Sequence, residues 1–301
     1  MKMKVFKRLN MSVGYRKPDW FKVPLSDRFG AEVKRLLADL QLHTVCREAH
    51  CPNIGECFNR GTATFLILGE VCTRNCRFCA IQSGKPEAPD PEEPNRIAQA
   101  VKRLNLTHCV ITGVNRDDLP RGGADYYAET VEKVKGLNPK TSVEVLPGDF
   151  DGSGEALKIV LDSNPDVFNH NLETVRRLTP LARDRRADYD ISLNLLRMAK
   201  ELRPDIKTKS GLLVGLGETT DEIIEAMYDL REVKCDGITL GQYIPPSSEH
   251  HPVEKYYTPE EFADFAGIAR QLNFSGIASG PLVRSSYHAG DFFKTADKLV
   301  K

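Results

Sequence analysis

The sequence predicts an α/β fold: a partial, open TIM-type (β/α)6 barrel with an N-terminal and a C-terminal extension. From Thr64 onward, short β-branched runs alternate with longer amphipathic segments, the pattern of β/α units around a parallel sheet. Six such units span about 180 residues, whereas a closed eight-stranded barrel takes about 250. Helix boundaries support this pattern, since Asp188 is suited to cap a helix and Pro139, Pro165 and Pro204 each follow a helical segment.

Each element is placed by its residue pattern. Strands are expected, in chain order, over residues 64–69, 109–114, 143–146, 167–171, 207–214 and 237–243. Helices are expected over residues 95–104, 124–135, 154–162, 189–202, 220–233 and 259–272. The chain then divides into an N-terminal extension (1–60), the barrel (61–258) and a C-terminal extension (259–301).

Charge and hydropathy argue against two classes of protein. The 301 residues include 42 basic and 42 acidic side chains, whereas a protein that binds the phosphate backbone of nucleic acid needs an excess of cations. Apolar stretches are far shorter than the roughly 20 residues of a membrane-spanning helix, and the basic start lacks the apolar region of a secretory signal. We therefore expect a soluble, cytoplasmic protein that binds neither nucleic acid nor membrane.

Cysteine is the informative residue type. Six of the eight cysteines lie between Cys46 and Cys79, and in a reducing compartment such grouping favours metal ligation over disulfides. Cys72, Cys76 and Cys79 share one loop directly after the first expected strand, at the end of the barrel where active sites collect. Three thiolates leave one iron of a four-iron cluster open to a small molecule. The alternative, a closed zinc site, usually needs paired half-sites with two further ligands.

A second triplet, Cys46-x4-Cys51-x5-Cys57, lies in the N-terminal extension beside His43 and His50. Soft thiols suit an iron–sulfur cluster, and three of them again leave one corner vacant. A mixed Cys/His zinc site would use the same residues. The spacing alone therefore leaves both interpretations open.

Both triplets resemble known family motifs. The chain resembles the radical S-adenosylmethionine (SAM) superfamily at Cys72-x3-Cys76-x2-Cys79 and, more narrowly, the lipoyl synthases at the N-terminal triplet. The resemblance covers residues 17–289 and includes RDDL at 116–119, NHNLET at 169–174, KSGLLVGLGET at 209–219 and RSSY at 284–287. The sequence departs from the family pattern at two positions. Gly113 stands where the family has serine, and Gly148 lies inside a stretch that is Pro-Asp-Phe in the family. Neither position is an expected cluster ligand.

The resemblance implies a reaction and a set of ligands. Cys72, Cys76 and Cys79 would hold a [4Fe-4S] cluster whose open iron binds SAM. The triplet Cys46, Cys51 and Cys57 would hold a second, auxiliary [4Fe-4S] cluster together with Ser286, which is favoured over Ser285. Two SAM molecules would supply two radicals, and two sulfur atoms of the auxiliary cluster would be inserted at carbons 6 and 8 of a protein-bound octanoyl group. The chain would then be a radical SAM sulfurtransferase.

Five further residues are expected to contact SAM. Asn171 and Glu173 lie in the segment that lipoyl synthases use for this cofactor, where they suit its ribose or amino group. Phe78, between two ligands, is placed to offer its backbone to the adenine. Thr112 and Asn115 end the second strand and are candidates for the methionyl carboxylate or amine, with an ordinary strand-end hydrogen bond as the alternative.

The implied partners follow from the same reaction. They are an octanoylated lipoyl carrier domain or H-protein as substrate, a flavodoxin or ferredoxin as reductant, and an iron–sulfur carrier for repair of the auxiliary cluster. Two other functions stay open at this point. One is a radical enzyme whose second cluster only relays electrons or anchors the substrate, and the other is a non-enzymatic metal-binding protein with zinc in the N-terminal triplet.

Overall fold

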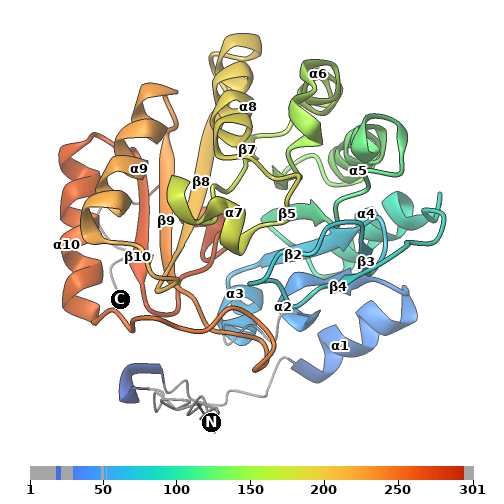
Figure 1. The fold of residues 1–301 in the computed structure, drawn as a ribbon. Helices are drawn as coiled ribbons and strands as arrows, with labels where there is room; N and C mark the ends of the chain where they lie inside the picture. The colour runs from blue at the N-terminus through green and yellow to red at the C-terminus, as the bar shows by residue number, and fades with distance from the viewer. Residues whose placement is uncertain (1–17, 22–29, 49–50, 52, 295–301) are drawn as a thin grey trace, which may run out of the picture.

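The main sheet forms an open barrel in the computed structural model, which describes residues 18–21, 30–48, 51 and 53–294 (Figure 1). Its strand order is β1-β2-β5-β6-β7-β8-β9-β10. Their bounds are β1 His43–Thr44, β2 Thr62–Ile67, β5 His108–Gly113, β6 Ser142–Leu146, β7 Val167–Asn169, β8 Lys207–Val214, β9 Gly237–Gln242 and β10 Gly276–Gly280. All neighbours run parallel except β1 and β2. Within the described residues β10 pairs only with β9, so the sheet does not close.

Helices cover the outer face of the sheet (Figure 1). Those that connect or follow the strands are α4 Glu93–Arg103, α5 Ala124–Leu137, α6 Gly154–Asp162, α8 Tyr189–Leu202, α9 Thr220–Glu232 and α10 Pro259–Gln271. The remaining helices are α1 Gly30–Asp39, α2 Val45–Glu48, α3 Ile54–Asn59 and α7 Thr179–Ala182, with 3-10 turns η1 Asp19–Phe21, η2 Pro120–Gly123, η3 Phe150–Gly152, η4 Arg176–Leu178 and η5 Ala289–Asp291. Strands β3 Val71–Cys72 and β4 Gln82–Ser83 form a second, small sheet.

The predicted fold class is confirmed. All six expected strands and all six expected helices are present, with ends that differ by at most two residues. Asp188 caps α8 by accepting a hydrogen bond from the backbone N–H of Ile191. The structure adds a seventh parallel strand, β10, after α10. The sheet therefore continues past residue 258 into the part of the chain expected to be an extension.

The two faces of the barrel strands differ in chemistry. Alternate side chains such as Ile111 and Val145 are fully buried toward the helices and form the hydrophobic core. The inner face carries polar groups, among them a fully buried ion pair in which the Lys209 ammonium lies 3.1 Å from the Glu144 carboxylate. Asn169 donates a 2.7 Å hydrogen bond to the same carboxylate. Each buried charge is thus paired and hydrogen-bonded, the condition under which burial is tolerated.

Residues 281–294, the return segment, run back along the inner face of the barrel after β10. A Cβ at Gly237 would lie 2.4 Å from the Phe292 ring, and a Cβ at Gly276 would lie 2.5 Å from it. A Cβ at Gly241 would lie 2.1 Å from the Val283 carbonyl oxygen. A Cβ at Gly290 would be 3.0 Å from His108 at the start of β5. The return segment therefore bridges the first and last parts of the open sheet, and three glycines on β9 and β10 make room for it.

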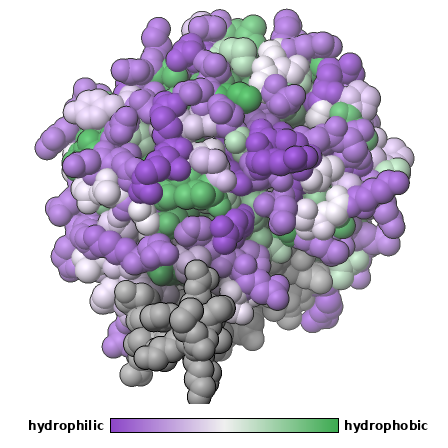
Figure 2. All heavy atoms as spheres, viewed as in Figure 1, coloured by the Kyte–Doolittle hydropathy of each residue, from purple (hydrophilic) through white to green (hydrophobic). Residues whose placement is uncertain are grey.

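Large apolar side chains are buried with few exceptions. Among the described residues the exposed ones are Trp20, Leu137, Leu181, Leu202 and Tyr228, which belong to five different elements. Figure 2 shows a mainly hydrophilic face with scattered apolar side chains. None of the described helices combines the length and the apolar character that crossing a bilayer requires.

The close approach of Phe292 to β9 leads to a stability prediction. We expect Gly237→Ala to lower the free energy of unfolding by about 1–3 kcal/mol, because its methyl group overlaps the Phe292 ring. In a Phe292→Ala background, Gly237→Ala should lower the free energy of unfolding by a smaller amount. Denaturant unfolding of the parent, the two single variants and the double variant measures this coupling. Gly267→Ala in α10 is the control, since its Cβ meets no atom within 4 Å and alanine favours the helix. Equal costs of Gly237→Ala in both backgrounds would contradict the packing described.

Candidate active site

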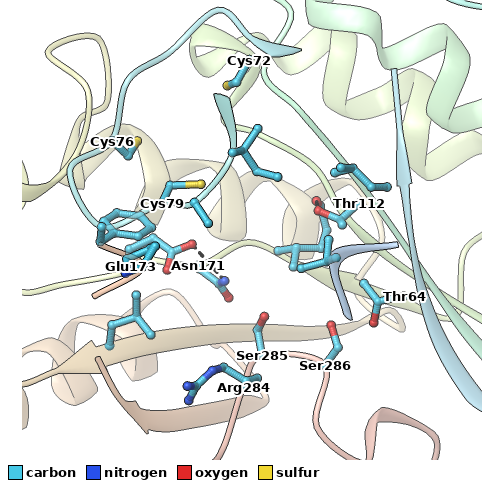
Figure 3. Close-up of a pocket in the computed structure, with 18 of the residues that line it drawn as sticks. Thr64, Cys72, Cys76, Cys79, Thr112, Asn171, Glu173, Arg284, Ser285 and Ser286 are labelled. Atoms are coloured by element: carbon cyan, nitrogen blue, oxygen red, sulfur yellow. Dashed lines mark hydrogen bonds between the residues drawn. The ribbon is translucent and has the colours of Figure 1, made fainter. Parts of the chain in front are cut away.

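A cavity of about 570 Å³ lies at the C-terminal ends of the strands, where the loops of β/α barrels build active sites. Cys72, Cys76 and Cys79 line one side (Figure 3). Ser285 and Ser286 of the return segment line the opposite side (Figure 3). The structure therefore brings the first predicted cysteine triplet and the predicted serine, more than 200 positions apart in sequence, to one space.

The loop of residues 72–79, the cluster loop, is anchored by Arg74. The Arg74 side chain is 2% exposed and donates to both carboxylate oxygens of Asp149, at 2.5 and 2.7 Å. It also donates to Asp117, at 2.8 Å, and Asp117 accepts a second bond from the Thr73 hydroxyl. Burial works against the charge of Arg74, but the hydrogen bonds that it donates to both carboxylates, together with their negative charge, prevail and raise its pKa. Arg74 is therefore a permanent cation that ties the cluster loop to the ends of β5 and β6.

A second anchor lies beyond α7. The backbone N–H of Asn75 donates to the Asp184 carboxylate at 2.9 Å, and the N–H of Asp184 donates to the Cys76 thiol at 3.3 Å. Arg77 donates its N–H to the Ala182 carbonyl at 2.8 Å. With Arg74 on the other side, the backbone of the cluster loop is held by the protein itself, so the three thiols are preorganised for a ligand.

The N-terminal triplet is a separate group behind this cavity. Cys46 belongs to α2 and Cys57 to α3, and Cys51 donates its N–H to the Cys46 carbonyl at 2.9 Å. The Cys46 thiol hydrogen-bonds Thr64 of β2, whose side chain lines the cavity. Cys46 therefore lies directly beside a residue of the cavity wall.

The return segment docks on this triplet. Asn53 donates a 2.6 Å hydrogen bond to the Leu282 carbonyl, and the Glu56 carboxylate accepts from Tyr287 at 3.2 Å and pairs with His288 at 2.9 Å. Cys57 packs in one apolar cluster with Val283 and Tyr287. Residues on both sides of Ser285 and Ser286 are thereby fixed against the helix that carries Cys57. In Figure 3, Ser286 lies on the side of Thr64.

The thiols are buried and chemically suited to a cluster. Burial, together with the neighbouring Cys51 and Cys57, raises the pKa of Cys46 to about 12. Burial likewise raises the pKa of Cys79 to about 12 and those of Cys57 and Cys76 to about 11. Such thiols lose their protons on binding a metal centre, and three of them per site are the donor set of a cluster with one further ligand position.

A zinc site receives no support from the residues around the triplet. His43 pairs with Glu70 at 2.9 Å, and His50 lies outside the described residues. In the part of the chain that the structure covers, no three His, Cys, Asp or Glu side chains are grouped closely enough to hold one metal ion. A cluster distributes its ligands around four irons and therefore does not need three side chains grouped around one metal ion.

The five residues expected to contact SAM all line the cavity. Asn171 donates a 3.0 Å hydrogen bond to Glu173, and its own oxygen has no partner among the described residues (Figure 3). Burial raises the pKa of Glu173. The Thr112 hydroxyl donates to the Leu146 carbonyl at 2.7 Å, the strand-end bond that was the alternative for this residue. Phe78 and Asn115 complete the set.

Both departures from the family pattern have a steric reason. A Cβ at Gly113 would stand 2.6 Å from the buried hydroxyl of Tyr127, which has no hydrogen-bond partner among the described residues. A Cβ at Gly148 would stand 2.0 Å from the side-chain oxygen of Asn115. A tyrosine hydroxyl and an amide thus occupy the space that larger side chains would need.

Three arginines of the cavity were not expected as site residues. Arg183 donates to the Ser192 hydroxyl at 2.9 Å, while its charge acts on Glu173 and Cys76. Arg284 is part of the RSSY motif, but the motif itself does not indicate that its side chain lines the cavity. Arg74 is a third case, since its partner Asp149 is 75 positions away and has no sequence signal.

Comparison with known proteins gives close relatives. The radical SAM superfamily profile matches residues 66–230. A lipoyl synthase from Caldanaerobacter subterraneus is 53% identical over 91% of this chain and 96% of its own length. Lipoyl synthases from Geobacillus kaustophilus and Staphylococcus epidermidis are each 54% identical over 94% of this chain, and 95% and 93% of their own lengths are covered.

Two solved structures share the fold. The FeFe-hydrogenase maturase HydG from Carboxydothermus hydrogenoformans matches with a TM-score of 0.61 at 14% identity, over 87% of this chain and 68% of its own. Methylornithine synthase (PylB) matches with a TM-score of 0.55 at 14% identity, over 82% of this chain and 70% of its own. At these identities the likeness concerns the fold alone.

The Arg74 anchor leads to the prediction for this site. Arg74→Leu leaves the buried Asp149 carboxylate without its partner and should lower the free energy of unfolding by roughly 3–5 kcal/mol. Adding Asp149→Asn should recover part of the loss. Denaturant unfolding of the metal-free protein provides the measurement. Lys158→Leu is the control, because its pair with Asp162 is exposed and worth at most about 1 kcal/mol. A similar cost at both positions would show that Arg74 is no anchor.

Proposed function

The chain belongs to the lipoyl synthase family of the radical SAM superfamily, and we propose that the cavity lined by the cluster loop and Ser286 is the reaction space between the two clusters of this family. The enzyme inserts two sulfur atoms at carbons 6 and 8 of a protein-bound octanoyl group. When bound, one [4Fe-4S] cluster would supply one electron to each SAM, which splits into methionine and a 5′-deoxyadenosyl radical, and the auxiliary [4Fe-4S] cluster would supply the sulfur. The observation that carries the proposal is that the Cys72–Cys79 loop and Ser286 line the same cavity.

The cluster loop would bind and orient the first cluster. Cys72, Cys76 and Cys79 are its ligands in this proposal, and the anchors at Arg74 and Asp184 keep their spacing fixed before the cluster is bound. Fixed ligands would hold the bound cluster at the wall of the cavity that Asn171 and Glu173 also line. These two side chains would form hydrogen bonds with the polar parts of SAM, and Phe78, Thr112 and Asn115 would lie around it.

The cavity wall suits an alkyl chain. Leu66, Leu146 and Leu213 from three strands line it, together with Ile81 and Val114. An octanoyl chain that enters this space buries its methylene groups, each worth about 0.8 kcal/mol, and displaces water from the path of a reactive radical. The walls would therefore position carbons 6 and 8 between the two sites and limit side reactions.

The auxiliary site would be completed from both ends of the described chain. Cys46, Cys51 and Cys57 supply three soft ligands and Ser286 a hard oxygen, which is a poor match for an iron–sulfur centre. The serine-bound corner is then the weakest one, in keeping with a cluster that is consumed as a sulfur source. Family membership favours this sulfur-donor role over an electron relay and over a non-enzymatic zinc protein.

We also propose specific protein partners and a cellular location. The octanoyl group would arrive on a lipoyl carrier domain or H-protein, electrons from a flavodoxin or ferredoxin, and new clusters from an iron–sulfur carrier. The balanced net charge supports the absence of nucleic acid and membrane partners. All eight cysteines are free thiols, which supports a reducing, cytoplasmic location. Residues 1–60 and 259–301 would act as the parts that hold the auxiliary cluster, and 61–258 as the SAM-binding barrel.

Removing one cysteine from each triplet separates the two roles. We expect Cys76→Ala to abolish formation of 5′-deoxyadenosine, because the SAM-binding cluster loses a ligand. Cys51→Ala should keep SAM cleavage but form no dithiolated product from an octanoylated lysine peptide, as measured by mass spectrometry. Cys235→Ala removes a buried thiol outside the site and should retain the iron and sulfide content of the parent protein. Dithiolated product from Cys51→Ala would refute the sulfur-donor assignment.

Neighbouring serines give a matched pair for the oxygen ligand. Ser286→Ala should lower the iron bound by the auxiliary site and stop product formation, whereas Ser285→Ala should leave the iron content unchanged. Ser286→Cys offers a softer ligand, so the cluster should be retained while product forms at least about tenfold more slowly. Iron and sulfide assays with single-turnover kinetics provide the measurements. If Ser285→Ala lost auxiliary iron and Ser286→Ala did not, the ligand would be Ser285 and the proposed assignment would be wrong.

A further inference from the structure

The turn between β2 and the cluster loop has an unusual backbone. Leu68 and Gly69 both lie in the left-handed region, with φ angles of 70° and 95°. Glycine adopts this region freely, but leucine does so only against steric strain. Leu68 is buried, and a Cβ at Gly123 would lie 2.9 Å from its side chain, so Leu68 packs closely against η2. Such strain persists only where the surrounding structure holds the residue in place, and it is typical of functional sites.

Two buried charged side chains hold the two peptide groups of Leu68. The Glu93 carboxyl group, at the start of α4, accepts a hydrogen bond from the Leu68 N–H at 2.9 Å. The Arg116 guanidinium donates to the Leu68 carbonyl at 3.1 Å. Arg116 is itself fixed by Asp118, which accepts from two of its nitrogens, each at 2.8 Å. Buried hydrogen bonds of charged groups are strong ones, so Glu93 and Arg116, the Leu68 clamp, offset the strain of the turn.

The segment that supplies Arg116 also holds the chain beyond Cys72. Thr73 donates its N–H to the Asn115 carbonyl at 3.0 Å, and its hydroxyl donates to Asp117 at 2.5 Å. Cys72 therefore lies between two points that are fixed to the residues after β5, one at Leu68 and the other at Thr73. The RDDL motif at 116–119 thereby has a structural task, since its first two residues hold the chain on both sides of the first thiol of the cluster loop.

The clamp lies outside the cavity. Glu93 and Arg116 do not belong to the residues that line it, whereas Cys72 does. Any effect of the clamp on a ligand in the cavity must therefore pass through the position of the cluster loop. A Leu68 that relaxed to a negative φ would change the direction of the chain four residues before Cys72, so this thiol would leave the place where the structure holds it.

We propose that Glu93 and Arg116 are positioning residues for the SAM-binding cluster: by keeping Leu68 left-handed, they direct Cys72 into the cavity together with the other two thiols of the cluster loop. The inference rests on the proposed function, since it needs a cluster on this loop. The Leu68 clamp fixes the approach of the chain to the first ligand, whereas the two anchors already described fix the loop after it. Support of the ligands by residues behind them is what a preorganised site requires.

A matched pair of substitutions at Leu68 tests the left-handed conformation. The full-length chain carries alanine at Cys46, Cys51 and Cys57, so that all bound iron belongs to the cluster loop. Leu68→Ala and Leu68→Gly both remove the side chain, but only glycine is left-handed without strain. Leu68→Gly should therefore retain more iron and sulfide than Leu68→Ala and form 5′-deoxyadenosine about fivefold faster. A packing role alone predicts the reverse order, because alanine fills more space, and that order would overturn the proposal.

Removal of the clamp provides the second measurement, in the same chain. Arg116→Met should lower the retained iron and sulfide and slow 5′-deoxyadenosine formation in proportion, by about fivefold. The loss should be smaller in the Leu68→Gly background than in the Leu68→Ala background, because glycine leaves no strain to offset. Glu93→Gln keeps an acceptor for the Leu68 N–H and should stay close to the parent, whereas Glu93→Leu should resemble Arg116→Met. Arg121→Met is the control, since the ion pairs of Arg121 are exposed.

Spectra of the reduced cluster separate positioning from direct contact with SAM. The fraction of Arg116→Met that binds a cluster should show the same change in its electron paramagnetic resonance spectrum on addition of SAM as the parent. An altered change would make Arg116 a SAM contact and overturn the proposal. Equal losses from Arg116→Met in the two Leu68 backgrounds, or failure of the metal-free variant to fold, would assign Arg116 to the scaffold and overturn it as well. A parent chain whose cluster loop binds no cluster would instead refute the proposed function itself.

Discussion

The reaction space depends on one constraint, which is that the return segment occupies the open side of the barrel. In that position it places Ser286 in the cavity wall, docks Tyr287 and His288 on α3, and packs Phe292 against β9 and β10. A six-unit barrel has a lateral gap that a closed barrel lacks. The chain uses this gap to bring two terminal regions to one cavity, so the openness of the barrel is a requirement of the site.

Buried charge is distributed in keeping with this arrangement. Each strongly buried cation among the described residues lies beside a carboxylate: Arg74 pairs with Asp149, Arg116 with Asp118 and Lys209 with Glu144. Carboxylate partners make Arg74 and Lys209 permanent parts of the scaffold, because removing either partner leaves an unbalanced charge.

Features that depend on local pattern could be predicted from the sequence, and features that depend on distant contacts could not. The six strands were predicted because β-branched runs alternate with amphipathic segments, and the place of Cys72, Cys76 and Cys79 on one loop at the cavity was predicted because their spacing is short and follows a strand. Strand β10 was missed because its Gly-Ile-Ala-Ser-Gly run has small residues where the return segment packs. The contacts of Arg74 with Asp149 and of Asn53 with Leu282 join residues 75 and 229 positions apart, and nothing in either local sequence marks the partner.

The path of the return segment has a consequence for biosynthesis. Residues 57 and 286 are separated by 229 positions, and every strand of the sheet is translated between or before them. Nascent chains fold from their N-terminal end, so the three early thiols leave the ribosome long before Ser286 is translated. In the proposed ligand set, the auxiliary site would therefore lack its fourth ligand until translation is nearly finished. The timing of its assembly would then be set by the order of the residues along the chain.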